Sequence, residues 1–188
     1  MRKEKFRGLL ILVLILIAVT ACGSVYAYMF KQTEEKKNQF TPAQVSCEVV
    51  EQTDTPLTQK NSIKVKNTSN IDAYLRVRLV SYWVNDLGDG NYEIVAKESE
   101  LPEITPMNGW IKGSNDTYYY TIPVAPESQS PNNLTTELLN ASIVLTEEDG
   151  YKQVIEVFAE AIQSEPQSAV TNSWGVTLGA DGMITAAP

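Results

Sequence analysis

Apolar and polar residues alternate with a period of two in several short stretches after residue 40. The stretches at residues 45–49 and 63–65 are brief, whereas the one at residues 73–84 is long and rich in β-branched and aromatic residues. A period of two is that of a strand with one buried face. We therefore predict a strand at each stretch and an interior strand at the third. Its core face is expected to carry Leu75, Val77 and Leu79.

Turn signals divide the rest of the chain into hairpins. DLGDGN at residues 86–91 precedes YEIVA, and Asp-Gly favours a hairpin because glycine tolerates the positive φ of tight turns. A second hairpin is predicted for residues 110–111 and 117–124. A third is predicted for residues 143–146 and 152–163 about EEDG at 147–150. The arm 152–163 also contains AEAIQ, which suits a helix, and propensity alone does not decide. As a strand, one face of this arm carries Ile155, Val157, Ala159 and Ala161.

The C-terminal part is expected to hold a short helix at residues 168–174, with Ser168 as its cap, and a small hairpin about Asp181-Gly182. Many short strands with turn signals and almost no helix are typical of antiparallel sandwiches. The predicted fold is an all-β, jelly-roll-like antiparallel β-sandwich with one short C-terminal helix.

The first thirty residues have the layout of an export signal. Four basic residues at positions 2–7 precede an apolar run at 9–21, as in a secretory signal peptide. Val25-Tyr26-Ala27 suits cleavage after Ala27, which would make Tyr28 the first mature residue. Two alternatives stay open. A small residue before Cys22 fits a lipoprotein signal, and the uncharged stretch 8–30 is long enough for a membrane anchor.

All three alternatives place the following domain outside the cytoplasmic membrane, secreted or attached to the cell surface. The expected organisation is a signal peptide at 1–27 (or an anchor to about residue 30), a polar spacer or donor segment at 28–39, and a β-sandwich at 40–188. The leader provides the only expected membrane contact, and signal peptidase is an expected partner.

Charge and composition narrow the function. The chain has 188 residues, a net charge of -8 and no histidine. Removing residues 1–27 takes away four basic residues and one acidic residue and leaves 11 basic against 22 acidic, a net charge of -11. Such acidity argues against nucleic acid as a partner. Cys47 alone follows the leader, so a disulfide within the domain is excluded, and its alternation with Val45 and Val49 predicts a small buried side chain.

Motifs for chemistry are missing. The sequence has no HExxH, no cysteine pair at zinc spacing and no glycine motif that cradles phosphate. DLGDGN lacks the ligand spacing of a calcium loop and is expected to be a turn. We expect no catalytic residue, no cofactor and no metal, and hence no enzyme. Tyr118, Tyr119, Tyr120 and Trp110 could form an aromatic platform for carbohydrate, although in a strand at least one of the tyrosines would belong to the core.

Several segments carry a resemblance to a known family. They are AYMFKQTEEKKNQFTPAQVSCEV, SIKVKNTSNIDAYLRVRLV, YYYTIPVAP, VIEVFAEAIQSE and SAVTNSWGV, of which KNTSNIDAYLRV at residues 66–77 is the most specific. Together they resemble the TasA/camelysin-like secreted proteins of Gram-positive bacteria, whose leaders are processed by a SipW-type signal peptidase. Camelysin-type members have been classed as metalloproteases, but the missing histidine and zinc motif put that activity in doubt here.

The resemblance implies a jelly-roll-like component of the cell envelope or biofilm matrix, and some members of the family polymerise by donating an N-terminal strand. Tyr28, Met29 and Phe30 would be an apolar start to the mature chain, which a soluble monomer has no use for. We therefore expect a non-enzymatic structural protein that associates with itself or with other surface proteins. The alternative is a ligand-binding or adhesive module held by a lipid or a membrane anchor.

Overall fold

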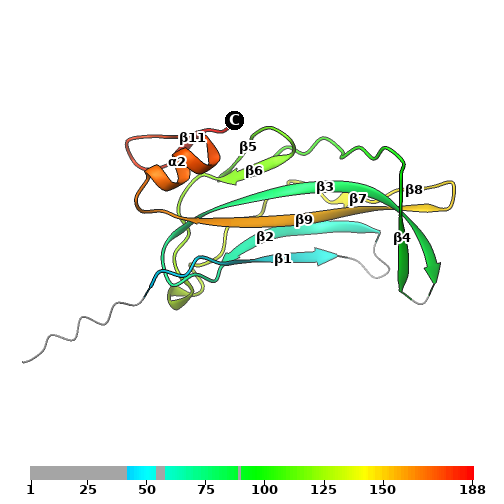
Figure 1. Cartoon of the computed structure of the whole chain (residues 1–188), viewed down its shortest axis with the longest axis horizontal. Coiled ribbons are helices and arrows are strands. Elements are labelled where there is room, and N and C mark those ends of the chain that lie inside the picture. The colour runs from blue at the N-terminus through cyan, green and yellow to red at the C-terminus, as the bar shows by residue number, and fades with distance from the viewer. Residues whose placement is uncertain (1–41, 54–57, 89) are drawn as a thin grey trace, which may run out of the picture. The chain divides into compact units, whose positions relative to one another are not determined.

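The structure, a computed structural model, describes residues 42–53, 58–88 and 90–188. These residues form two main antiparallel sheets packed face to face, with one α-helix at an end (Figure 1). The expected all-β sandwich with a short C-terminal helix is confirmed. The elements in chain order are β1 (Cys47–Thr53), β2 (Gln59–Asn67), β3 (Ala73–Gly88), β4 (Asn91–Val95), β5 (Trp110–Lys112), β6 (Thr117–Tyr120), the 3-10 turn η1 (Glu127–Gln129), β7 (Ile143–Val144), β8 (Glu147–Glu148), β9 (Tyr151–Gln163), α2 (Ser168–Trp174), β10 (Thr177–Leu178) and β11 (Ile184–Ala186).

The large sheet is built around two long strands. Its order is β5-β6-β3-β9-β8, and β4 pairs with β3 beyond the end of β6. β3 and β9 pair without a register shift from Ala73 opposite Gln163 to Asn85 opposite Tyr151, so the arm that also suited a helix is a strand. The small sheet has the order β1-β2-β7, and β10 pairs with β11 in a separate hairpin.

The core lies between the two sheets. Odd-numbered residues of β3 and β9 face β2, because successive side chains of a strand point to opposite faces. Leu75, Val77 and Leu79 are no more than 2% exposed and pack with Ile63 and Val65 of β2. The core face predicted for residues 73–84 is therefore confirmed, as is the hairpin that joins β3 to β4.

A smaller second core covers one end of the outer face of the large sheet. Tyr74 of β3 and Tyr119 of β6 point away from the main core and pack against Val170 and Trp174 of α2. The helix begins with Ser168 as its first helical residue, and Gln167 occupies the N-cap without a side-chain hydrogen bond. The expectation that Ser168 is the cap is thus wrong by one position. Gly175 ends the helix at φ +68°, a left-handed conformation that favours glycine.

The third predicted hairpin differs from the prediction in its turn and in its first strand. Glu147 and Glu148 are not in the turn but form β8, which pairs with the start of β9, so the turn consists only of Asp149 and Gly150. β7, which precedes β8 in the chain, belongs to the small sheet and pairs with β2. Both Asp149 and Gly150 have positive φ, which suits a tight two-residue turn and shortens the loop. The strand predicted for 117–124 likewise ends at Tyr120.

Candidate functional site

The two sides of the sandwich are closed differently. On one side, residues 133–139 run along β2 although they form no regular strand. Thr135 N–H donates to the carbonyl of Val65 at 2.9 Å, and Leu138 N–H donates to that of Ile63 at 2.9 Å. The same segment is tied to the large sheet, because the Trp110 indole N–H donates to the carbonyl of Thr136 at 3.2 Å. This side is therefore sealed by hydrogen bonds between the sheets.

On the opposite side, between β1 and β9, no further strand joins the two sheets in the part of the chain that the structure describes. β9 meets β8 only at Tyr151 and Lys152, and Gln153 N–H donates to the carbonyl of Thr146 at 2.9 Å. Beyond that point, no described strand pairs with the outer edge of β9 as far as Gln163. β1 is the other edge of the same side, since its only partner among the described strands is β2. We call this region, β1 and residues 154–163 of β9, the open side.

The main chain of the open side is directed outward. In β9 the N–H of Gln153 points away from β3, so the odd-numbered residues that follow it present their N–H and C=O groups to the open edge. In β1 the carbonyl of Ser46 points to β2, where Thr68 N–H donates to it at 3.1 Å. By the same alternation, Cys47 and Val49 direct their main-chain groups outward. Unpaired edges of this kind are templates for another strand.

Among the described residues, core-facing side chains along the open side are less buried than those at the centre of the core. On β9, Ile155 is 2% exposed, but the next core-facing residues, Val157, Ala159 and Ala161, are only half-buried. On β1, Cys47 is half-buried as well and packs against the same core. Ala159 and Ala161 are the smallest side chains of this row, and β1 and β9 lie close together at this side of the sandwich. An added strand with apolar side chains would bury this row. Burial of apolar surface stabilises the complex by about 25 cal/mol for each Å².

Charged groups line the rim of the open side. Glu160 receives two hydrogen bonds from the Arg76 guanidinium, the shorter at 2.6 Å, and Glu51 binds Lys60 at 3.0 Å. Burial, and secondarily the negative charge of Glu160, raise the pKa of the Cys47 thiol above its ordinary value. A raised pKa leaves less thiolate at neutral pH, so we expect Cys47 to react slowly as a nucleophile. The predicted small buried side chain is thus half right, because Cys47 packs on the core but stays partly accessible.

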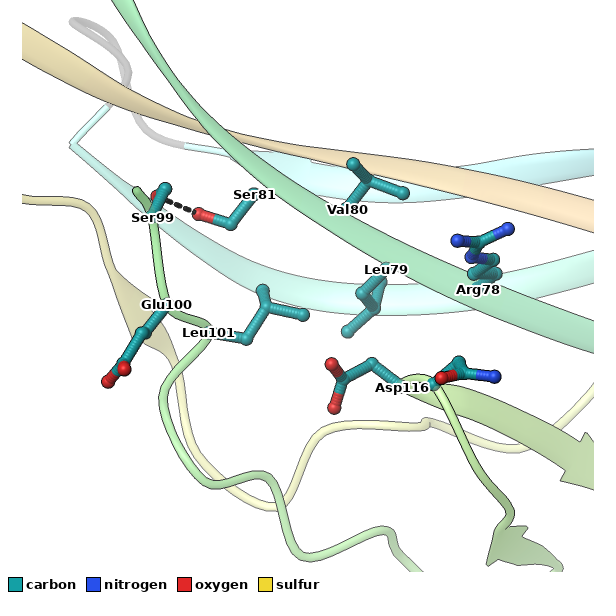
Figure 2. A pocket seen from close by; sticks show the side chains of 9 residues that line it. Arg78, Leu79, Val80, Ser81, Ser99, Glu100, Leu101 and Asp116 are labelled. Carbon is teal, nitrogen blue, oxygen red and sulfur yellow. Dashed lines mark hydrogen bonds between the residues drawn. The ribbon is translucent and has the colours of Figure 1, made fainter. Parts of the chain in front are cut away.

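A separate pocket of about 510 Å³ lies where the other edge of β3 is interrupted (Figure 2). β6 pairs with β3 up to Arg78, and β4 pairs from Trp83 onward, which leaves a short unpaired stretch between them in the described sheet. Leu79 and Leu101 form its apolar floor, and both belong to or pack against the main core. The other residues that line it are Arg78, Val80, Ser81, Ser99, Glu100, Asn115 and Asp116.

Ser81 and Ser99 of this pocket belong to a hydrogen-bond network with Gln153. The hydroxyl groups of Ser81 and Ser99 are 2.5 Å apart, and the Gln153 amide donates to Ser81 at 3.0 Å and to the carbonyl of Glu100 at 3.0 Å. Gln153 is 7% exposed, so this network satisfies polar groups at the end of the core. Within the described residues we find no group of three or more metal-ligating side chains, and no helix that is long and apolar enough to span a membrane. The network of Ser81, Ser99 and Gln153 therefore supports a structural role for this end of the core.

The structure tests only some of the site residues that the sequence predicts. Ala27, Tyr28, Cys22, Met29 and Phe30 all lie outside the described residues. The alternative of an aromatic platform at residues 118–120 is wrong, because the three tyrosines and Trp110 are between 0% and 7% exposed. Those on the inner face fill the main core, whereas Tyr119 fills the second core under α2. Both faces of β6 are covered, which the alternation of a single strand does not reveal.

Comparison of the chain with models of protein families, with curated proteins and with solved structures finds no match in any of the three. The open side itself was not predicted. Its only signal in the sequence is the pair Ala159 and Ala161 on the core face of a long strand, where large apolar residues are the norm. That signal does not say which edge of the strand lacks a partner.

Proposed function

We propose that this protein is an exported, non-enzymatic structural component of a bacterial cell surface or extracellular matrix. In this proposal, subunits join when the N-terminal segment of one copy adds to the open side of the next. The observation that carries the proposal is the coincidence of outward main-chain groups and a half-buried apolar row at Val157, Ala159 and Ala161. Strand addition uses both features, since it pairs the main chain and covers alternate side chains.

Two features of the sequence supply the rest of the proposal. Residues 1–30 have the layout of an export leader, and cleavage after Ala27 would start the mature chain with Tyr28, Met29 and Phe30. Several segments also resemble the TasA/camelysin-like secreted proteins, some of which polymerise by N-terminal strand donation. The donor would then be residues 28–39, with its apolar start covering the half-buried row at Val157, Ala159 and Ala161.

The experiment compares assembly of the mature protein with that of two variants. Deletion of residues 28–39 removes the donor, and Ala159→Pro removes an outward N–H that makes no bond to β3. We expect both variants to fold but not to assemble. Assembly is measured by light scattering and electron microscopy. Ile94→Pro is the matched control, since the N–H of Ile94 also points away from its neighbour, β3, on the open edge of β4. Equal assembly of all four proteins would refute strand donation.

The form of the exported chain is tested by mass spectrometry of the mature protein from its natural host. We expect an N-terminus at Tyr28. A diacylglyceryl group on Cys22 would replace this proposal with that of a surface lipoprotein, and an intact Met1 would indicate a membrane anchor.

A further inference from the structure

A second pocket, of about 520 Å³, opens on the outer face of the large sheet. It lies toward the end that carries the β3–β4 hairpin, whereas α2 covers the other end of the same face (Figure 1). Strand pairing brings several of its residues together. Tyr82 of β3 lies opposite Val154 of β9, and Val84 of β3 lies opposite Lys152 of β9. On its other side, Val84 lies opposite Ile94 of β4. The residues that line it are Thr58, Tyr82, Val84, Tyr92, Glu147, Lys152, Gln153 and Val154.

Two tyrosines shape this pocket. Tyr92 is 60% exposed on β4, and Tyr82 is half-buried on the neighbouring strand. Val84 beneath them is only 4% exposed, so it forms a floor rather than a surface. On an uncovered sheet face, polar side chains are the norm, and a cluster of aromatic and aliphatic groups in a hollow marks a binding site.

The charged residues that line this pocket are one lysine, Lys152, and one carboxylate, Glu147. The Lys152 ammonium binds the Asp86 carboxylate at 2.8 Å, so its charge is compensated. Glu147 adds an exposed carboxylate, and Tyr82 and Tyr92 add their phenol groups. The described residues of the pocket therefore offer aromatic faces, hydrogen-bonding groups and a cation that is already paired.

These features select among ligand classes. An anionic polymer would meet the carboxylate of Glu147, whereas the one cation among the described lining residues, Lys152, is already paired with Asp86. A peptide laid on this face would find the main chain of β3 and β9 already paired and would leave its own N–H and C=O groups without partners. A neutral sugar has apolar ring faces that stack on tyrosine and hydroxyl groups that bind carboxylate, amide and phenol groups.

We propose that this pocket binds a neutral oligosaccharide, with Tyr92 and Tyr82 stacking on sugar rings and Glu147 accepting hydrogen bonds from sugar hydroxyl groups. The site faces away from the main core. Its one residue from the open side, Val154, directs its main-chain groups to β3 and not to the open edge. Binding would thus give the protein a glycan contact that is independent of strand donation.

The test is calorimetric titration of the folded mature protein with four probes: cellotetraose, the β-1,4-linked tetramer of N-acetylglucosamine, tetragalacturonate and an uncharged ten-residue peptide of alternating valine and threonine. We expect binding of at least one neutral tetramer and none of tetragalacturonate or the peptide. The two neutral probes distinguish a plain glucan from an N-acetylated glycan. Binding of neither neutral tetramer, or preference for the peptide or the anionic sugar, would overturn the proposal.

Variants assign the binding to this pocket. Tyr92→Ala is expected to weaken it at least tenfold, and Glu147→Gln several-fold. Phe158→Ala is the matched control, because Phe158 is 49% exposed on the same outer face but does not line the pocket, and it should bind as the parent does. Because Glu147 is exposed, its variant keeps the test decisive even if Tyr92→Ala fails to fold. Unchanged binding in Glu147→Gln, or an equal loss in Phe158→Ala, would refute the site.

Discussion

The Arg76 guanidinium carbon lies 4.7 Å from the centre of the Trp174 ring and so joins β3 to α2. The same guanidinium is 5.9 Å from the ring centre of Tyr119, and it also binds Glu160 on β9. One side chain thus holds together the large sheet and the helix that covers its outer face. Trp174 is 6% exposed and Glu160 is 54% exposed, which suggests that these contacts differ in strength.

We expect Trp174→Ala to lower the free energy of unfolding by about 3 kcal/mol or more, as for other large-to-small changes in a core. Arg76→Ala should cost about 1–2 kcal/mol through the cation–π contacts. Glu160→Ala should cost about 1 kcal/mol or less, because exposed ion pairs contribute little. Urea unfolding of the three variants and of the double variant at Arg76 and Trp174 measures the coupling. An equal loss in Glu160→Ala and Arg76→Ala would show that the ion pair dominates.

Val77 is fully buried at the centre of β3, between the two sheets. Val77→Asp would place a carboxylate there without a partner, at a cost of about 3 kcal/mol or more. Thermal unfolding should therefore occur at a clearly lower temperature, or the variant should fail to fold. Val144→Asp is the control, because Val144 is 64% exposed and should tolerate the change. Parental stability of Val77→Asp would contradict the core.

Asn67 holds the turn after β2 through its buried amide. The Nδ2 group donates to the carbonyls of Val124 at 2.8 Å and Ala125 at 3.0 Å, and the Oδ1 atom accepts from Ser69 N–H at 2.9 Å. Asn67→Asp keeps the shape but turns a carboxylate oxygen toward those carbonyls. We expect a loss of about 2–4 kcal/mol in chemical denaturation. The exposed Asn140 provides the control Asn140→Asp, and comparable losses in both variants would contradict this role of Asn67.

The alkylation rate of the Cys47 thiol measures how accessible the open side is. Because burial raises the pKa of its thiol, the thiolate fraction at pH 8 is smaller than in the unfolded chain, and alkylation by iodoacetamide should be slower. The rate should rise as the pH increases through the raised pKa. If a donated strand covers β1 and β9, assembly should slow alkylation further. Equal rates in assembled and unassembled protein would place the contact elsewhere.

The negative charge of the mature chain should make assembly depend on salt. With 11 basic and 22 acidic residues after residue 27, subunits repel one another at low ionic strength. Screening shortens the range of this repulsion to about 10 Å at 0.1 M salt. Light scattering should therefore show more assembly at about 0.1 M salt than at about 0.01 M. Assembly should also increase on acidification toward the pI of the mature chain, which lies below the value of about 4.6 for the full sequence. Assembly that weakens with added salt would instead indicate attraction between opposite charges.

The sequence by itself determined the elements that depend on local pattern. Alternation in residues 73–84 and 152–163 identified β3 and β9 and the face that each buries, because the period of two follows from the geometry of one strand. Asp-Gly placed the hairpin after β3, and the helix at 168–174 was found with an error only in its cap.

Only the tertiary structure decided which strands are neighbours. Alternation says nothing about the edges of a strand, so it could not show that β7 joins β2, that residues 133–139 seal one side, or that the side between β1 and β9 stays open. It likewise could not separate the buried tyrosines at 118–120 from Tyr82 and Tyr92 in the outer pocket. Contacts between residues far apart in sequence are set by how the sheets and their covering segments pack, which no local pattern encodes.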